Sequence, residues 1–311
     1  MYTNNRGRET VCFVIRAVPY KESSLIIDAL SMDMGRISFV AKGARNVRSS
    51  LKSMLQLFTP IKVTLKGLNN GLKTLVECEQ AGKQISFLPP TLFSALYLNE
   101  LIYFLYKIED DSTGLFSAYT EALNMMLDER KVEMALRNFE LTMMEELGGG
   151  IDFYHESDSE KVVNPHTWYL YRLNKGFIPI NSDLISSNIN VDEVYRGADL
   201  LNILERKYTP SSLRAAKRIC RQNIQSLLNG RELMSRKLYL EYIESDVKYA
   251  DSFKDSFQNR REKANKSRVK DKNRKGCSSD RITSKDQQEP QVDNQVSENL
   301  NSSSVPACSD V

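Results

Sequence analysis

The hydrophobic pattern changes its period at Pro89-Pro90, and this change most constrains how the chain can fold. Before it, residues 61–66 place an apolar side chain at every second position, as in a strand with one face on a core. After it, Thr91–Ile108 is apolar on nearly every side, as in a buried helix. The chain has 311 residues, enough for two such parts. We therefore expect an α+β protein, with a β domain over residues 1–84 and a helical domain over 85–245.

The first part contains five strand-like runs between residues 10 and 80. They are Thr10–Val18, Ser24–Leu30, Gly35–Ala41, Pro60–Leu65 and Leu72–Glu79, with a short helix at Ser49–Leu57 and a turn at Leu68–Gly71. Five strands with a helix between the third and fourth follow the order of an OB-fold, a partly open Greek-key barrel that commonly binds single strands. An SH3-like or other small barrel is the alternative that this pattern leaves open.

The second part shows helical periodicity interrupted by one irregular, polar insert at 151–200. After Thr91–Ile108 the expected helices are Leu115–Leu127, Val132–Leu147, Ala198–Arg206, Ser211–Leu228 with Ser211 as N-cap, and Arg231–Glu244. The insert contains a hairpin, Trp168–Leu173 with Gly176–Ile180. Gly148-Gly149-Gly150 is interpreted as a helix end, because no GxxxxGK[ST] phosphate loop follows it.

Residues 246–311 are polar and contain few large apolar side chains, so we expect a disordered tail. Its basic run at 260–275 either adds non-specific affinity for DNA or is simply solvated.

Positive charge is concentrated in the first part. Residues 1–85 hold 13 Lys and Arg against 6 Asp and Glu, a net charge of +7, whereas the remainder carries −4. Ser38–Gly67 contains no acidic residue, and the cheapest partner for such a surface is a polyanion such as a nucleic acid. The candidate contacts in this stretch are Lys42, Arg45, Arg48, Lys52, Lys62 and Lys66.

A second basic run lies on one face of a predicted helix, at Arg214, Lys217, Arg218 and Arg221. It is either a continuation of the nucleic-acid track or a solvated helix face.

Nothing in the chain predicts catalysis. There is no GxSxG, P-loop or HExxH pattern, and the only histidines are His155 and His166, eleven positions apart in a polar loop. The cysteines form no CxxC pair, which argues against a disulfide framework and a four-cysteine zinc site. They are Cys12, Cys78, Cys220, Cys277 and Cys308. We expect a protein that is not an enzyme and has no cofactor.

Two segments of the sequence indicate where in the cell the protein is located. The N-terminus lacks the apolar stretch of a signal peptide, and Asn99, Glu100 and Lys107 interrupt the most apolar segment. We expect a cytoplasmic protein with no membrane contact.

Five stretches together carry a resemblance to a known family. They are YKESSLIIDALSMDMGRISFVAKGAR at 20–45, LQLFTPIKV at 55–63, LYLNEL at 96–101, ALRNFELTMMEELGGGIDF at 135–153 and LRAAKRICRQNIQSLLNGRELMSRKL at 213–238. Each is short and chemically ordinary, but their order and spacing over residues 10–240 resemble RecO, the bacterial recombination mediator family of the RecF pathway. The tail is not covered by the resemblance.

The resemblance implies an OB-fold joined to a helical domain. It implies binding of single- and double-stranded DNA, annealing of complementary strands, and work with RecR to load RecA on DNA coated by single-strand-binding protein. Through the GRISFVAKGAR match, the resemblance implies that Arg36, Lys42 and Arg45 contact DNA. The ALRNFE match makes Arg137 the contact for the acidic, apolar C-terminal tail of single-strand-binding protein.

The residues around Arg137 are compatible with two arrangements. A groove between Thr91–Ile108 and Leu136–Leu141, rimmed by Arg137, would suit a short peptide that ends in an apolar residue and a carboxylate. The alternative is plain core packing with Arg137 on the surface.

One departure from the family concerns metal. Many members hold a four-cysteine zinc site after this helix end, but residues 151–175 contain no cysteine, so zinc is not expected here. The function predicted is a DNA repair and recombination mediator, monomeric and associated with the bacterial nucleoid. The alternatives are an RNA-binding or ribosome-associated OB-fold protein and a nuclease built on an OB platform.

Overall fold

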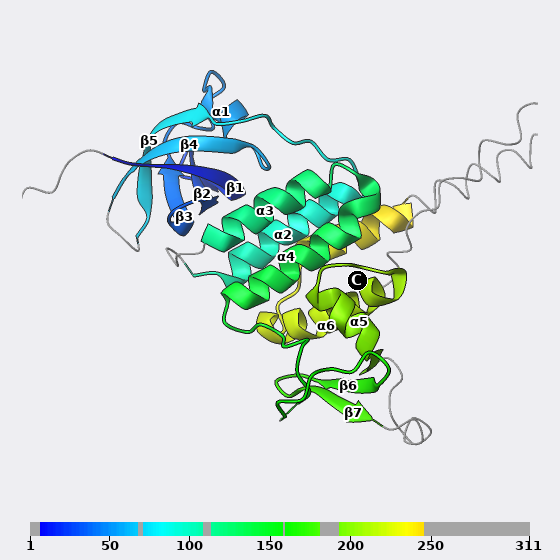
Figure 1. Ribbon diagram of the computed structural model, residues 1–311. Coiled ribbons are helices and arrows are strands. Elements are labelled where there is room, and N and C mark those ends of the chain that lie inside the picture. The colour runs from blue at the N-terminus through cyan, green and yellow to red at the C-terminus, as the bar shows by residue number, and fades with distance from the viewer. Residues whose placement is uncertain (1–6, 68–70, 108–112, 158, 181–192, 246–311) are drawn as a thin grey trace, which may run out of the picture. The chain divides into compact units, whose positions relative to one another are not determined.

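The computed structural model describes residues 7–67, 71–107, 113–157, 159–180 and 193–245. The chain divides into two compact units, residues 1–239 and 240–311. Every element labelled in Figure 1 lies in the first unit. The expected tail at 246–311, with its basic run and with Cys277 and Cys308, lies outside the described residues, as does most of the turn expected at Leu68–Gly71.

Five strands close into a barrel (Figure 1). They are β1 (Arg8–Tyr20), β2 (Ser24–Ser31), β3 (Gly35–Ala41), β4 (Pro60–Lys66) and β5 (Lys73–Gln80). The strands pair in the order β1-β2-β3-β5-β4, and β1 closes the ring against β4; only β3 and β5 are parallel. The OB-like barrel predicted from the sequence is confirmed. The helix expected between the third and fourth strands is a single turn, α1 (Leu51–Met54).

β1 separates two hydrophobic cores, because its side chains alternate between the barrel interior and the helices. Cys12 and Val14 are fully buried inside the barrel, whereas Phe13 and Ile15 belong to the core shared with the helices. The pairing of β1 with β2 shifts between Val14 and Arg16, as at a β-bulge, so Arg16 follows Ile15 onto the outer face. The bulge thereby directs a charged side chain toward the helices.

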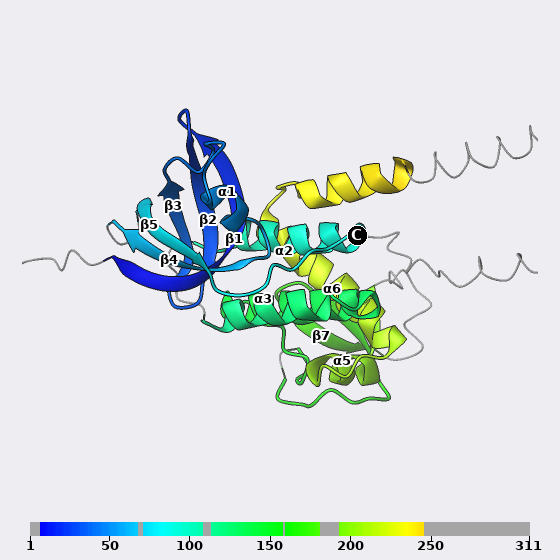
Figure 2. The ribbon, with the colours of Figure 1, turned by 90° about the horizontal axis from the view of Figure 1, so that it is seen from above.

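Three helices run side by side next to the barrel (Figures 1 and 2). They are α2 (Thr91–Leu105), α3 (Thr113–Met125) and α4 (Val132–Glu146), with the short helix η1 (Glu129–Lys131) leading into α4. Their core side chains include Leu98, Leu101, Tyr119 and Phe139, all fully buried. α2 stops at Leu105, before the predicted Ile108, because Tyr106 adopts an extended conformation.

The triple glycine ends α4, as predicted. Gly148 has a φ of 75°, and its N–H donates to the Glu145 carbonyl oxygen at 3.0 Å. The Gly149 N–H donates to the Met144 carbonyl oxygen at 2.9 Å. These two bonds form a Schellman motif, in which glycine adopts the left-handed conformation without a steric penalty.

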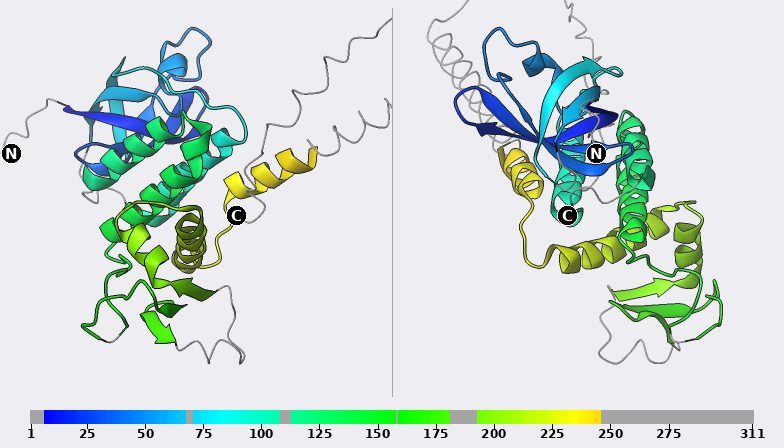
Figure 3. Two further views of the ribbon diagram at one scale, coloured as in Figure 1. Left: turned by 45° about the vertical axis from the view of Figure 1, so that its right-hand side comes forward. Right: turned by 90° about the vertical axis from the view of Figure 1, so that its left-hand side faces the viewer.

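A second sheet lies on the far side of α5 (Gly197–Leu204) and α6 (Pro210–Leu228) from the barrel (Figures 1 and 3). Its strands are β6 (Trp168–Arg172), β7 (Gly176–Ile180) and β8 (Val194–Arg196), in the order β7-β6-β8. The hairpin is as expected, but β8 was not predicted, since three residues give no readable alternation. The sheet buries one aromatic face, made of Tyr169, Tyr171, Phe177 and Tyr195.

The start of α6 differs from the sequence-based expectation. Thr209 is the N-cap, not Ser211: Thr209 Oγ1 accepts the Ser212 N–H at 3.2 Å, and Ser212 Oγ accepts the Thr209 N–H at 2.8 Å. Pro210 then fits the first helical position, where its missing N–H costs nothing. The next helix begins at residue 234 rather than at the expected Arg231 and is described to residue 245.

Candidate nucleic-acid interface

Four predicted contact residues lie together on the surface between β3 and β4. They are Lys42, Arg45, Arg48 and Lys52, here called the basic loop, and all four are exposed. Within the described residues none of them has a carboxylate at ion-pairing distance, in contrast to several other surface cations of the chain. The basic loop therefore presents to solvent positive charge that no carboxylate in the described part of the chain compensates.

The turn between β1 and β2 lies against the basic loop. The Arg45 backbone N–H donates to the Ser23 carbonyl oxygen at 2.9 Å, and Arg45 Nη1 donates to the Lys21 carbonyl oxygen at 3.3 Å. Strand register explains the proximity, because Leu25 pairs both with Pro19 of β1 and with Ala41 of β3. Lys21 thus joins the basic surface. Lys21 was not predicted as a contact because it lies outside the acid-free stretch.

Lys62 lies in a different electrostatic environment. Its Nζ is 2.9 Å from Glu9 Oε2 on β1 and 3.5 Å from Glu79 Oε1 on β5. The hydrogen bond to Glu9 and the charges of Glu9 and Glu79 raise the pKa of Lys62. The alternating strand that suggested a basic face is therefore flanked by carboxylates on both neighbouring strands. Lys66, at the end of β4, is exposed.

Arg36 lies at the junction between the barrel and the helices. Its Nη1 donates to the Tyr103 carbonyl oxygen on α2 at 2.9 Å, and its guanidinium carbon is 5.1 Å from the Tyr103 ring centroid. Arg16 donates to the Tyr103 hydroxyl at 2.6 Å and lies 3.6 Å from Asp28. Two arginines thus hold the C-terminal turn of α2, where the helix dipole favours positive charge.

This position separates Arg36 from the basic loop. Arg36 pairs with Leu30 near the start of β3, whereas Lys42 follows its end. Six residues of strand correspond to about 20 Å. The role of Arg36 in DNA binding stays a prediction, and the structure does not bring it together with the other basic residues carried over from the family.

The basic residues of α6 divide between several partners. Arg214 is exposed. Lys217 Nζ lies 3.7 Å from Glu133 Oε1, and its side chain is only 16% exposed. The guanidinium carbon of Arg218 is 5.3 Å from the ring centroid of Tyr195, which joins α6 to the small sheet. Arg221 is half-buried. Part of the basic face of α6 therefore contacts α4 and β8 instead of facing solvent.

Arg137 is buried, so the alternative that placed it on the surface is wrong. Arg137 is 5% exposed and Glu140 is 1% exposed, and Arg137 Nη2 donates to Glu140 Oε1 at 2.9 Å. The Tyr97 hydroxyl donates to the same oxygen at 2.7 Å. Burial raises the pKa of Glu140, and the Arg137 charge opposes this effect. Arg137 Nε and Glu140 Oε2 have no hydrogen-bond partner among the described residues.

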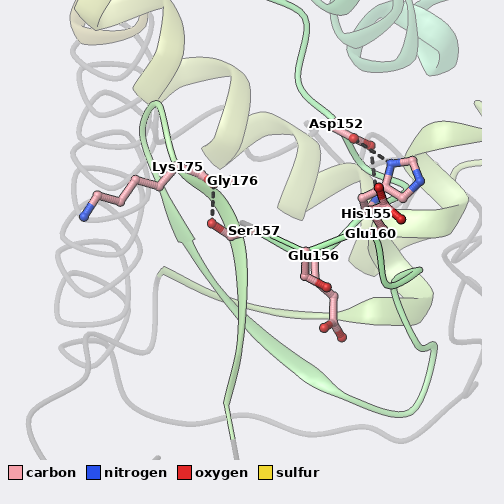
Figure 4. Close-up of a pocket in the computed structure, with 8 residues that line it drawn as sticks. Asp152, His155, Glu156, Ser157, Glu160, Lys175 and Gly176 are labelled. Carbon is pink, nitrogen blue, oxygen red and sulfur yellow. Dashed lines mark hydrogen bonds and ion pairs between the residues drawn. The ribbon is translucent and has the colours of Figure 1, made fainter.

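The segment after α4 surrounds a hollow of about 340 Å³ (Figure 4). In it, Asp152 Oδ2 lies 2.8 Å from His155 Nδ1, and Asp152 Oδ1 accepts the backbone N–H groups of Tyr154 and His155. Burial works to raise the pKa of Asp152, but these bonds outweigh it and hold the pKa below its usual value. The lining residues are Asp152, His155, Glu156, Ser157, Ser159, Glu160, Lys175 and Gly176.

These residues do not fit the zinc site that the resemblance places here in many relatives. The described residues contain no group of three or more His, Cys, Asp or Glu side chains able to hold a metal ion. Asp152 Oδ2 is already paired with His155 Nδ1, and Asp152 Oδ1 with two backbone N–H groups. No described helix has the length and apolar character needed to cross a membrane.

The fold and the basic loop define an OB-fold protein with a surface suited to polyanions. The family model "Recombination protein O N terminal" matches residues 8–83, and "Recombination protein O C terminal" matches residues 89–237. The DNA repair protein RecO of Aliivibrio salmonicida is 39% identical over 239 residues, covering 76% of this chain and 97% of the relative. The chain belongs to the RecO family of DNA repair proteins.

Two further relatives show the same extent of similarity. The DNA repair protein RecO of Tolumonas auensis is 37% identical over 233 residues, which are 74% of this chain and 94% of the relative. That of Vibrio cholerae is 39% identical over 230 residues, 73% of this chain and 92% of the relative. The resemblance found in the sequence is confirmed.

Proposed function

We propose that this protein is a non-enzymatic mediator of DNA repair in the RecF pathway. It binds single- and double-stranded DNA, anneals complementary strands, and works with RecR to help load RecA onto DNA coated by single-strand-binding protein. The observation that carries this proposal is the basic loop on a closed OB-like barrel, whose four cations have no carboxylate partner among the described residues. Membership of the RecO family supports it. The protein acts in the bacterial cytoplasm, at the nucleoid.

Electrostatics supplies the mechanism. Contacts to phosphates give affinity and orientation without reading sequence, which suits a protein that must act on any damaged region. A cationic surface that contacts two complementary strands at once lowers their mutual repulsion and so favours pairing. No covalent bond is made or broken in this process, so it requires no catalytic group.

Partner binding is proposed for the helical part. Arg137 contacts the C-terminal tail of single-strand-binding protein, an acidic and apolar peptide. Arg137 Nε lacks a partner among the described residues, so its capacity to donate to a carboxylate is unused there. Since Arg137 already bonds Glu140, the tail binds by sharing or replacing that bond.

Salt dependence of DNA binding tests the basic loop. Each single-strand phosphate that is neutralised contributes about −0.7 to the slope of log K against log salt. The variant Lys42→Gln with Arg45→Gln should flatten the slope by about 1.4. Lys62→Gln is the matched control, because Lys62 is already compensated by Glu9 and Glu79. An unchanged slope in the double variant, or an equal change in Lys62→Gln, would place the DNA site elsewhere.

Annealing of coated strands tests the mediator role. Two complementary oligonucleotides are each covered with single-strand-binding protein and mixed with and without this protein, in the absence of nucleotide. The proposal predicts faster pairing. Acceleration of naked strands alone would support the basic loop but reject the partner contact, and no acceleration at all would favour an RNA-binding role. Labelled DNA incubated with Mg²⁺ should keep its length, because shortening would identify a nuclease.

A further inference from the structure

The only tryptophan of the chain, Trp168, is exposed at the start of β6. It is 38% exposed, although tryptophan side chains are highly buried on average. Trp168 lies on the outer face of the small sheet, opposite the face that buries Tyr169. Its neighbour in register on β8 is Arg196, which is also exposed.

Trp168 and Arg196 form a stacked pair. The guanidinium carbon of Arg196 is 5.5 Å from the centroid of the Trp168 ring, within the range of a cation–π contact. The partly exposed Leu170 and Ile178 continue the same face next to the pair. The surface therefore combines an aromatic ring, a guanidinium group and an apolar floor.

The charge of Arg196 is not compensated within the described residues. Arg172 lies on the same face and pairs with Glu193, whereas no described carboxylate lies within ion-pairing distance of Arg196. The stacked Arg218 differs in another way, because its ring partner Tyr195 is only 3% exposed. Arg196 thus offers its donors to an external anion beside a ring that solvent can reach.

The backbone holds this pair rigidly. The Gly197 N–H donates to the Thr167 carbonyl oxygen at 2.9 Å, which ties the residue after Arg196 to the residue before Trp168. A Cβ at Gly197 would lie far inside contact distance of the Asn164 carbonyl oxygen, so only glycine allows this approach. A preorganised pair loses little conformational freedom when a ligand binds.

We propose that Trp168 and Arg196 form a second contact site for single-stranded DNA. An unpaired base stacks on the indole ring, and the guanidinium group donates to a phosphate of the same strand. Single-stranded DNA is favoured over duplex DNA because it presents both a free π-face and a regular anion, whereas the bases of a duplex are stacked on one another. The inference rests on the proposed function, since it assigns a further site for the same ligand.

The location of the pair gives the site a distinct use. It lies on the small sheet, which α5 and α6 separate from the barrel (Figure 3). A strand that contacts both the basic loop and Trp168 must therefore pass along the helices. Two separated contacts on one strand would hold it extended, with its bases available for pairing.

Tryptophan fluorescence tests the proposal directly, because all indole emission comes from Trp168. The full chain is titrated with oligothymidine of about 16 nucleotides, a length within the site sizes of OB-fold proteins. We expect saturable quenching of the emission, and much weaker quenching by a duplex of the same length. Fluorescence anisotropy of labelled oligonucleotide measures binding independently in the same samples.

Variants separate the two halves of the site. Trp168→Ala should weaken single-strand binding about tenfold, the size of one stacked base, whereas Trp168→Phe should retain most of the affinity. Arg196→Gln should flatten the salt slope by about 0.7 and leave the fold intact, as checked by thermal unfolding. The variant Lys42→Gln with Arg45→Gln should lower affinity but keep the quenching at saturation.

Each contrary outcome has a clear meaning. If anisotropy reports binding while Trp168 emission stays unchanged, the proposal is overturned and the proposed function stands. If no oligonucleotide binds at all, the proposed function itself fails. If an acidic tail peptide quenches Trp168 and oligothymidine does not, the pair is a protein-docking site and the proposal is rejected.

Discussion

Removing Arg137 alone should destabilise the protein strongly, because it leaves Glu140 without its charge partner in the core. Arg137 and Glu140 are 5% and 1% exposed, and 2.9 Å separates Nη2 from Oε1. Breaking a buried pair by removing one partner costs about 3–5 kcal/mol. For a folded region of this size, that loss corresponds to a fall in Tm of roughly 6–20 °C. Arg137→Met should therefore unfold at a markedly lower temperature than the wild type.

Removing both charges should recover most of the lost free energy of unfolding. In Arg137→Met with Glu140→Gln, neither side chain of the pair is charged, and the Gln carbonyl oxygen can still accept the Tyr97 hydroxyl. Replacing a whole buried pair is often neutral, in contrast to breaking it. Urea unfolding followed by circular dichroism gives the free energy of unfolding of all variants and completes a double-mutant cycle.

The pH dependence of the single variant gives a second test of the same reasoning. Burial already raises the pKa of Glu140, and loss of Arg137 removes the charge that opposes this effect. A carboxyl whose pKa is higher in the folded state binds more protons when folded, so stability falls as pH rises above the ordinary pKa of Glu, about 4.3. The deficit of Arg137→Met should thus be small near that pH and large at neutral pH.

The result that would refute this reasoning is a loss below about 1 kcal/mol in Arg137→Met, the size expected for an exposed pair. A deficit independent of pH would also contradict it. The same variants decide the ligand role of Arg137, because the stable double variant should still fail to bind the tail peptide. Tail affinity equal to that of the wild type would show that Arg137 only supports the core.

Two further predictions concern single residues of the fold. Gly197→Ala should lower the free energy of unfolding by about 1–3 kcal/mol, because the new Cβ would clash with Asn164. Gly149→Ala is the control, since its Cβ would meet nothing closer than 3.8 Å and should not lower stability. Equal Tm values for the two variants would argue against the tight β8–α5 junction. Burial raises the pKa of Cys78 to about 11, and the nearby charge of Glu79 makes a smaller contribution in the same direction. Alkylation of Cys78, followed by peptide mass spectrometry, should therefore rise about tenfold per pH unit from pH 7 to 9, and a plateau near the ordinary thiol pKa of about 8.5 would reject the shift.

The barrel strand β4 could be predicted because it has an unambiguous period. Ile61, Val63 and Leu65 alternate with polar residues, and all three are buried in the barrel core. The short strand β8 could not be predicted, because Val194–Arg196 is too short to show a period and its partner β6 ends at Arg172, 22 positions earlier in the sequence. The β-bulge that directs Arg16 outward is likewise set by pairing with β2 rather than by local sequence.

The candidate site was predictable in part for a related reason. A sequence gives the formal charge of each residue but not the charges that the fold places beside it. Lys42 and Lys62 look equivalent in the acid-free stretch, yet strand pairing brings Glu9 and Glu79 to Lys62 and no described carboxylate to Lys42. Arg137 shows the same effect in the protein interior, because it forms a buried ion pair with Glu140, one helical turn away. Arg196 shows the converse, since β8, which was not predicted, places on an exposed indole a guanidinium that has no carboxylate partner among the described residues. The residues to test first are therefore those whose charge the fold leaves unpaired, wherever they lie in the sequence.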